Sequence, residues 1–340
     1  MTSFFLLCII VLVFLTDPFY QYHKPFFNMK PVVYNQRYQN PGIAKNFDYD
    51  SILIGSSMSD NFDTLWFDEK FECKTMKLTY EGVRTGNMGY MLKFAHESRP
   101  LEKVFIGLDL DPLFDTYGNY YFPLPTYLYD RNLPNDVSYL LNKSVIFDSI
   151  PKMITSNLNN TMTPLNLVYG WSGYNTFSQE KALSSVWWDM DGVKNEKIDT
   201  EAYVTNVTQN LDENIIPYIK EHPETEYYIF YPPSSVLWWN MKVYQQNLDE
   251  ILEVVQLSAE KLLIYPNVHL GTFQHELEIT GNLDNYKDYN HYKSEVNKYM
   301  LDHLLDEKYQ ITSENLEEHI NQIRTMTLEY DFSELESKTD

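Results

Sequence analysis

The chain has 340 residues, of which 44% are hydrophobic, so whole-chain disorder and coiled coil are excluded in favour of one large α/β domain or two average domains. Its 26 Lys and Arg residues face 48 Asp and Glu residues, giving a formal net charge of -22. This charge excludes a general nucleic-acid binder, because such proteins need a basic surface against the phosphates. It also argues against docking on an anionic membrane through a basic patch, but leaves a hydrophobic anchor open.

The chain begins with an apolar segment. Phe4 to Leu15 are twelve uninterrupted apolar residues, about 18 Å of helix, against about 30 Å for a hydrocarbon core. In an otherwise polar chain this run favours a signal-anchor or signal peptide over a core helix, and no small-residue cleavage site follows it. We therefore expect residues 1–20 to form an N-terminal membrane anchor, residues 21–47 an extended stalk, and the rest to be extracytoplasmic.

Beyond residue 47, short β-branched or aromatic runs alternate with longer helical patterns, which is typical of βαβ units. Residues 48–310 are thus predicted to form a three-layer α/β/α sandwich around a five-stranded, mostly parallel sheet. The predicted strands are Ser51–Ile54, Thr75–Leu78, Val104–Leu110, Tyr227–Tyr231 and Val268–Phe273. The predicted helices are Asp60–Phe71, Gly86–Ser98, Glu201–Glu221, Asn240–Glu260 and Lys293–Leu305.

Residues 111–200 form a gap too long for a simple crossover, and we interpret them as a large insertion at the carboxyl end of the third strand, the edge where open α/β sheets bind ligands. Five tryptophans either line a glycan cleft or pack in the core: Trp171, Trp187, Trp188, Trp238 and Trp239. Residues 311–340 are expected to form a C-terminal helix, capped by Thr312 or Ser313, and a loose acidic tail from Thr327.

The first candidate for chemistry follows the first predicted strand, in Gly55-Ser56-Ser57-Met58-Ser59. A serine on a strand-to-helix turn presents its Oγ at the carboxyl edge of the sheet, close to helix N-terminal amides that can stabilise an oxyanion. Glycine permits the tight turn. We interpret Ser57 as a candidate nucleophile; the alternative is a plain helix N-cap.

The second candidate is Asp288-Tyr289-Asn290-His291, between the last predicted strand and the last long helix. Asp288 is placed to accept the Nδ1 proton of His291, which leaves Nε2 to activate a serine brought close by the sheet. Alone, this spacing also fits a surface histidine that caps a helix. Its position and the presence of Ser57 favour a Ser-His-Asp triad.

The order Ser57, Asp288, His291 resembles the SGNH/GDSL hydrolase family over Asp48 to Leu305. The Gly-Asp-Ser-x-Ser block of that family is matched here with Ser56 in place of Asp, and its Asp-x-x-His block is matched by Asp288 and His291. The Gly-Ser-Ser variant with an N-terminal anchor resembles the DltD-like branch, whose members assist acyl transfer onto cell-envelope polymers. The resemblance implies Ser57 as nucleophile, His291 as general base, Asp288 as its orienting partner, and a membrane acyl-transfer protein as a partner.

The same resemblance implies an oxyanion hole formed by Ser57, by Gly82 or Gly86, and by Asp109. Asp109 stands in Gly107-Leu108-Asp109-Leu110, where the family has an asparagine whose amide donates. A carboxylate at this place would repel a developing oxyanion unless it is protonated or turned away.

These patterns lead to two hypotheses. The first is an extracytoplasmic serine esterase or O-acyltransferase, held in the cell membrane by a single-pass N-terminal anchor, that acts on acyl groups of a cell-surface polysaccharide. The second is a catalytically inactive SGNH-fold protein that binds glycans or scaffolds an assembly. The sequence lacks the common metal and nucleotide motifs, so neither a metal nor another cofactor is expected.

Overall fold

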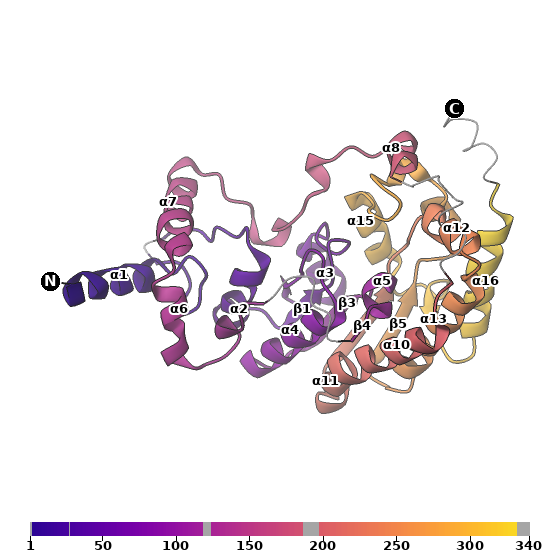
Figure 1. The fold of residues 1–340 in the computed structure, drawn as a ribbon, viewed down its shortest axis with the longest axis horizontal. Coiled ribbons are helices and arrows are strands. Elements are labelled where there is room, and N and C mark those ends of the chain that lie inside the picture. The colour runs from indigo at the N-terminus through magenta and orange to yellow at the C-terminus, as the bar shows by residue number, and fades with distance from the viewer. Residues whose placement is uncertain (1, 27, 118–123, 186–196, 332–340) are drawn as a thin grey trace.

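A computed structural model of the chain describes residues 2–26, 28–117, 124–185 and 197–331. Its centre is a six-stranded sheet in the order β2-β1-β3-β4-β5-β6 (Figure 1). The first five strands are parallel, and β6 pairs antiparallel with β5 at the edge. The strands are β1 (Ser51–Ile54), β2 (Thr75–Lys77), β3 (Lys103–Gly107), β4 (Glu226–Tyr231), β5 (Val268–Thr272) and β6 (Gln310–Ile311).

Helices cover both faces of the sheet because successive strand residues point to opposite sides. In β1, Ile52 and Ile54 belong to one buried cluster and Leu53 to another, and every residue of this strand is buried. The first cluster is covered by α4 (Thr85–Ser98), α10 (Thr200–Asn214), α13 (Leu248–Leu263) and α16 (Leu316–Glu329). The second is covered by α3 (Thr64–Phe71) and α15 (Ser294–His303). The prediction of a three-layer α/β/α fold is confirmed.

Several element boundaries differ from those predicted. The sheet has a sixth strand, β6, which is only two residues long and so gives no sequence pattern. The predicted helix Glu201–Glu221 is divided at Ile215 into α10 and α11 (Ile216–Glu221), where a proline occupies the first turn of α11. The predicted helix Asn240–Glu260 is likewise two helices, α12 (Val236–Tyr244) and α13.

The segment before the sheet is not a simple extended stalk. Residues 36–46 form α2 (Gln36–Asn46), which Asn35 caps by accepting a hydrogen bond from the backbone N of Tyr38. Ile43 and Ala44 of α2 are buried in the core. The C-terminal helix also differs, because α16 follows Asn315 and continues past Thr327 to Glu329.

The inserted residues contain short helices rather than a second sheet among the parts described. They are α5 (Leu110–Phe114), α6 (Val137–Leu140), α7 (Ile150–Asn159), α8 (Gln179–Ser184), a π-helical turn η3 (Val145–Ser149), and the 3-10 turns η1 (Thr126–Leu128), η2 (Leu133–Asp136), η4 (Leu165–Leu167) and η5 (Ser172–Tyr174). Two further short elements, α14 (Leu277–Thr280) and η6 (Leu283–Asn285), follow β5.

The N-terminal helix α1 (Thr2–Thr16) projects from one end of the molecule, and α16 lies at the opposite end (Figure 1). Most apolar side chains of α1 are exposed, among them Phe4, Phe5 and Leu7. Among the helices in the described ranges, none combines the length and apolar character needed to cross a membrane.

Candidate active site

Ser57, His291 and Asp288 lie in one hydrogen-bonded row at the carboxyl edge of the sheet. Ser57 Oγ lies 2.9 Å from Nε2 of His291, and Nδ1 of His291 lies 2.9 Å from Oδ2 of Asp288. The three side chains therefore have the relationship that a nucleophile, a general base and an orienting acid require. The structure brings together the three residues that the sequence placed 234 positions apart, from Ser57 to His291.

Ser57 is held by a tight turn directly after β1. The hydroxyl of Ser56 accepts a hydrogen bond from the backbone N of Met58 at 3.1 Å, and the side chain of Ser59 is buried between two glycines. A Cβ on either Gly55 or Gly107 would lie 2.2 Å from Oγ of Ser59, closer than real Cβ atoms approach. The glycines at the ends of β1 and β3 thus make room for the turn that carries the nucleophile. The helix predicted to follow at Asp60 begins later, since α3 starts at Thr64.

His291 is positioned by a compact loop before α15. Asp288 Oδ1 accepts hydrogen bonds from the backbone N atoms of Asn290 and His291, at 2.9 and 2.7 Å. Burial opposes ionisation of Asp288, but the hydrogen bond and charge of His291 and the two backbone donors outweigh it, so the pKa of Asp288 is lowered. Asp288 is therefore ionised at neutral pH and suited to orient the imidazole.

Gly82 and Asp109, both predicted at the oxyanion hole, occupy different surroundings. Gly82 lines the cavity that contains Ser57 and His291, and its φ of 64° is a conformation that favours glycine. Asp109 follows β3 at the N-terminus of α5 and is buried, so it does not belong to the predicted strand Val104–Leu110. Gly86, the alternative to Gly82, is buried within α4.

Asp109 lies beneath the nucleophile turn. Burial raises its pKa to about 7, although a hydrogen bond from Ser56 and the nearby charge of His291 act in the opposite direction. Among the described residues, Oδ2 of Asp109 has no hydrogen-bond partner. Ser56 and Asp109 thus form a buried contact at the two positions where the family pattern has Asp and Asn.

Trp171, from the insertion, contacts both Ser57 and His291. Its indole Nε1 donates a hydrogen bond to the backbone carbonyl of Ser57 at 2.8 Å. The indole and the imidazole of His291 meet edge to face, with centroids 5.5 Å apart, and Nζ of Lys287 lies 4.3 Å from the Trp171 ring centroid. The side chain of Trp171 therefore lines the cavity beside Ser57 and His291.

The position of Trp171 depends on Asn61, which no sequence motif singled out. Oδ1 of Asn61 accepts hydrogen bonds from the backbone N atoms of Trp171 and Ser172, both at 2.8 Å. The hydroxyl of Ser172 in turn accepts from the backbone N of Ser294 at 3.1 Å. The insertion is thereby joined to the nucleophile turn on one side and to α15 on the other.

The other tryptophans have different places. Trp238 and Trp239 are buried in the core, where their Nε1 atoms donate to Asp111 and Gln274, so core packing is the alternative that the structure shows for these two. Trp187 and Trp188 lie outside the described residues.

Two buried charged residues, Lys77 and Asp60, lie beside the site. Nζ of Lys77 donates to the backbone carbonyls of Asp60 and Val168, at 2.7 and 2.9 Å, and the carboxylate of Asp60 accepts from Thr79 and Gln36. Burial raises the pKa of Asp60 and lowers that of Lys77. Lys77 therefore holds the loop after Ser57 against the segment that leads to Trp171.

The cavity around Ser57 and His291 has a volume of about 930 Å³. Four aromatic, three basic and two acidic residues are among those that line it: Tyr34, Tyr169, Trp171, Tyr289, Arg37, Arg84, Lys287, Asp60 and Glu81. Arg84 also forms an ion pair with Asp115 at 2.5 Å.

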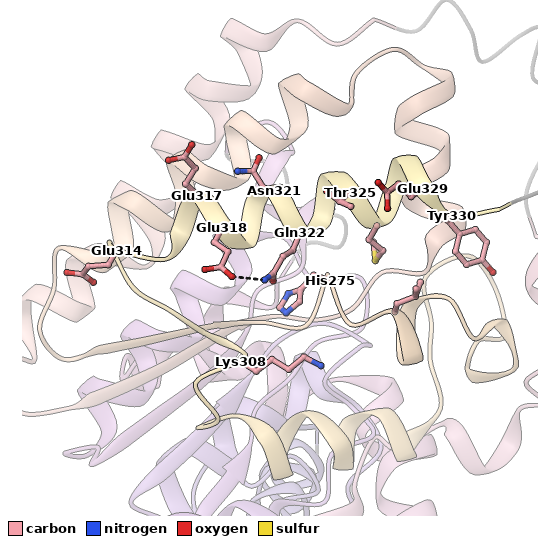
Figure 2. Close-up of a pocket in the computed structure, with 12 residues that line it drawn as sticks. His275, Lys308, Glu314, Glu317, Glu318, Asn321, Gln322, Thr325, Glu329 and Tyr330 are labelled. Atoms are coloured by element: carbon pink, nitrogen blue, oxygen red, sulfur yellow. Dashed lines mark hydrogen bonds between the residues drawn. The ribbon is translucent and has the colours of Figure 1, made fainter.

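A second cavity, of about 970 Å³, lies along α16. Figure 2 shows its lining, in which Glu318 and Gln322 are hydrogen-bonded at 3.2 Å beside His275 and Lys308. None of the residues of the Ser57–His291–Asp288 row lines it. Its size alone therefore does not make it the reactive site.

The sequence matches no family model and no curated protein. Among solved structures, one described as "a putative platelet activating factor from Streptococcus pneumonia" is similar at 13% identity and a TM-score of 0.39. The match covers 79% of this chain and 91% of that chain.

Proposed function

We propose that this protein is an SGNH-type serine esterase or O-acyltransferase with Ser57 as its nucleophile. The observation that carries the proposal is the continuous row from Ser57 Oγ through His291 to Asp288, with both contacts at 2.9 Å. The row opens into a cavity, so an ester can reach the hydroxyl. A plain helix N-cap at Ser57 would not require either His291 or Asp288.

The reaction begins when Nε2 of His291 takes the proton of the Ser57 hydroxyl while Oγ attacks the ester carbonyl carbon. The carbonyl oxygen becomes an oxyanion, for which the backbone N–H groups of Ser57 and Gly82 are the candidate donors. Collapse of this intermediate breaks the bond to the leaving alcohol, which receives the proton from His291, and leaves the acyl group on Ser57. Asp288 stabilises the imidazolium without taking its proton.

The second half of the reaction decides between hydrolysis and transfer. His291 removes a proton from the incoming water or sugar hydroxyl, whose oxygen attacks the acyl carbon. The bond between that carbon and Oγ of Ser57 then breaks, and Oγ receives the proton back from His291. Water gives an esterase, and a sugar hydroxyl gives an O-acyltransferase. Exclusion of water from the cavity favours transfer.

We assign the acyl group to a cell-surface polysaccharide and the domain to the extracytoplasmic side of the cell membrane. The exposed apolar helix α1 supports attachment to a membrane, and the aromatic and hydrogen-bonding side chains that line the cavity support a glycan. A membrane protein that supplies acyl groups remains a proposed partner.

The test is labelling of the full chain with a fluorophosphonate, followed by release of acetate or another short acyl group from purified surface polysaccharide. Wild type is expected to label and to release the acyl group, and Ser57→Ala to do neither. Ser59→Ala, with its hydroxyl buried in the same turn, is the matched control and should still label. Equal labelling of wild type and Ser57→Ala would eliminate Ser57 as the nucleophile.

One observation favours a non-catalytic glycan-binding or scaffold protein instead. Asp109 stands where the family pattern has a donating asparagine, and a carboxylate cannot donate unless it is protonated. This alternative predicts glycan binding that is equal in wild type and Ser57→Ala, with no fluorophosphonate labelling at any pH.

A further inference from the structure

The insertion carries an apolar stripe that points to solvent. Around η3 and α7, one set of apolar residues is buried against the core, including Ile150 and Met153. A second set, spaced by four, three and four residues, is exposed: Phe147, Pro151, Ile154 and Leu158. Phe147 is 73% exposed and Leu158 is 80% exposed. The spacing puts all four on one side of the helical segment, as in an amphipathic helix whose apolar side needs a partner.

This stripe lies at the same end of the molecule as α1. In Figure 1, α1 projects from that end, next to α6 and α7. We call the surface formed by α6, η3 and α7 (residues 137–160) the wall. The joint between them is hydrogen-bonded: the hydroxyl of Tyr139 in α6 donates to Asp17 at 2.7 Å and accepts from the backbone N of Phe19 at 3.1 Å. The exposed apolar surface of α1 is thus joined to the wall that presents the second stripe.

α7 is also fixed to the segment that follows α1. The side chain of Asn157 accepts from the backbone N of Lys30 at 2.8 Å and donates to its carbonyl at 3.1 Å. Nζ of Lys152 lies 3.7 Å from the centroid of the Tyr34 ring, and Tyr34 lines the cavity that contains Ser57. The stripe therefore has a defined position relative to α1 and to the active-site cavity.

The charge of this wall differs from that of the rest of the chain. Residues 137–160 contain Lys143, Lys152 and Asp148 as their charged residues, in a chain with a net charge of -22. A lipid headgroup layer repels acidic surfaces when it is anionic, and it accepts weakly basic amphipathic helices. The surface around α7 therefore lacks the excess of acidic residues that would oppose contact with a bilayer.

We propose that Phe147, Pro151, Ile154 and Leu158 dock into the headgroup–acyl boundary of the bilayer into which α1 inserts. This inference rests on the membrane location in the proposed function. α7 then lies along the membrane surface while α1 enters it, and the two contacts together hold the domain in one orientation. Because α7 contacts Tyr34, the cavity containing Ser57 is kept next to the membrane surface.

The test uses the full chain with Cys8→Ser and Cys73→Ser, reconstituted in phosphatidylcholine and phosphatidylglycerol vesicles. One cysteine is then introduced, Leu158→Cys, and labelled with an environment-sensitive fluorophore. Lipids spin-labelled near the headgroup are expected to quench it several-fold more strongly than a fluorophore at Glu317→Cys on α16, an exposed position at the opposite end. Equal quenching at the two positions would overturn the docking.

The design separates docking from anchoring. If the full chain does not float with the vesicles, the membrane location in the proposed function fails and the docking fails with it. If the chain floats but the Leu158→Cys label is not quenched, the anchor stands and only the docking is overturned. Cross-linking of Leu158→Cys between two copies, without lipid quenching, identifies a self-association surface and also overturns it.

A second variant guards against unfolding. Ile154→Glu with Leu158→Glu should lower quenching of a label at Phe147→Cys several-fold, because two charges oppose entry of the stripe into lipid. Its thermal unfolding and its fluorophosphonate labelling should match those of the parent. Unchanged quenching in this folded variant would contradict the proposal.

Discussion

The indole Nε1 of Trp171 donates to the backbone carbonyl of Ser57 at 2.8 Å while the same ring packs edge to face against His291. One side chain of the insertion therefore touches both the residue that attacks and the residue that takes its proton. We expect Trp171 to be a positioning residue, whose loss loosens the 2.9 Å contact between Ser57 Oγ and His291 Nε2.

Trp171→Phe keeps an aromatic ring beside His291 but removes the indole N–H. One lost hydrogen bond of about 1 kcal/mol lowers the rate of acylation of Ser57 by roughly five- to tenfold. The rate of fluorophosphonate labelling measures this step, and Trp66→Phe, on α3, is the control. A larger loss for Trp171→Ala, with the ring contact also removed, separates the two contributions; equal rates in all variants would contradict a positioning role.

Asp288→Asn should lower kcat by about 10⁴-fold while leaving the fold intact, because the imidazole of His291 is then held in the wrong tautomer. The chain offers a matched control in Asp306→Asn, since Asp306 pairs with His303 at the same spacing on the surface. Ester hydrolysis and thermal unfolding are measured for both variants. A similar loss of activity in the two would show that the effect is not specific to the Asp288–His291 contact.

Asp109→Asn should stabilise the protein at alkaline pH more than at acid pH. Between the ordinary aspartate pKa of 3.8 and the pKa of about 7 in the folded chain, Asp109 is protonated in the folded chain and ionised in the unfolded chain. The folded state therefore binds more protons, so the free energy of unfolding falls as pH rises through this window. An asparagine at this position cannot ionise, so the variant loses this fall in the free energy of unfolding with pH. Its gain in Tm over wild type should therefore grow from pH 4 to about pH 8.

The control for this measurement is Asp302→Asn, an exposed acid on α15. A gain in Tm for Asp109→Asn that is independent of pH would argue that Asp109 is ionised in the folded chain throughout. If the charge of Asp109 also opposes the oxyanion, the same variant should extend ester hydrolysis to higher pH than wild type.

Gly55→Ala should destabilise the protein and displace Ser57, because the added Cβ would lie 2.2 Å from Oγ of Ser59. Overpacking of this kind costs about 1–3 kcal/mol of unfolding free energy. Ser59→Gly in the same chain removes the clashing atoms and should restore part of the stability and of the labelling rate. Gly173→Ala, at which a Cβ would meet nothing within 4 Å, should be nearly neutral.

The sequence predicts the site best where a reactive residue directly follows a strand or precedes a helix. Ser57 directly follows a short apolar strand and His291 precedes a helix, and a parallel sheet brings such positions to one edge. Asn61 could not be predicted, because its contact with Trp171 joins segments 110 residues apart without any local pattern. The same holds for α2, whose polar and proline-containing residues do not show the periodicity of a helix, although Ile43 and Ala44 are buried.

Tertiary packing also overrode local patterns at other positions. For Trp238 and Trp239 the sequence leaves a glycan cleft and core packing equally open; in the fold both indoles are buried, and their Nε1 atoms donate to Asp111 and Gln274. Asp109 was predicted inside a strand because its neighbours Leu108 and Leu110 are apolar; they are buried, but β3 ends at Gly107.

The contacts that complete the site join very distant parts of the chain: Lys77 to Val168, Trp171 to Ser57, and Ser57 to His291, with separations of 91, 114 and 234 residues. Contacts of such separation form late in folding, because the intervening chain must first be ordered. During synthesis, a chain that has not yet reached His291 carries Ser57 as an ordinary hydroxyl. Reactivity at Ser57 therefore arises only once almost the whole polypeptide has emerged and folded.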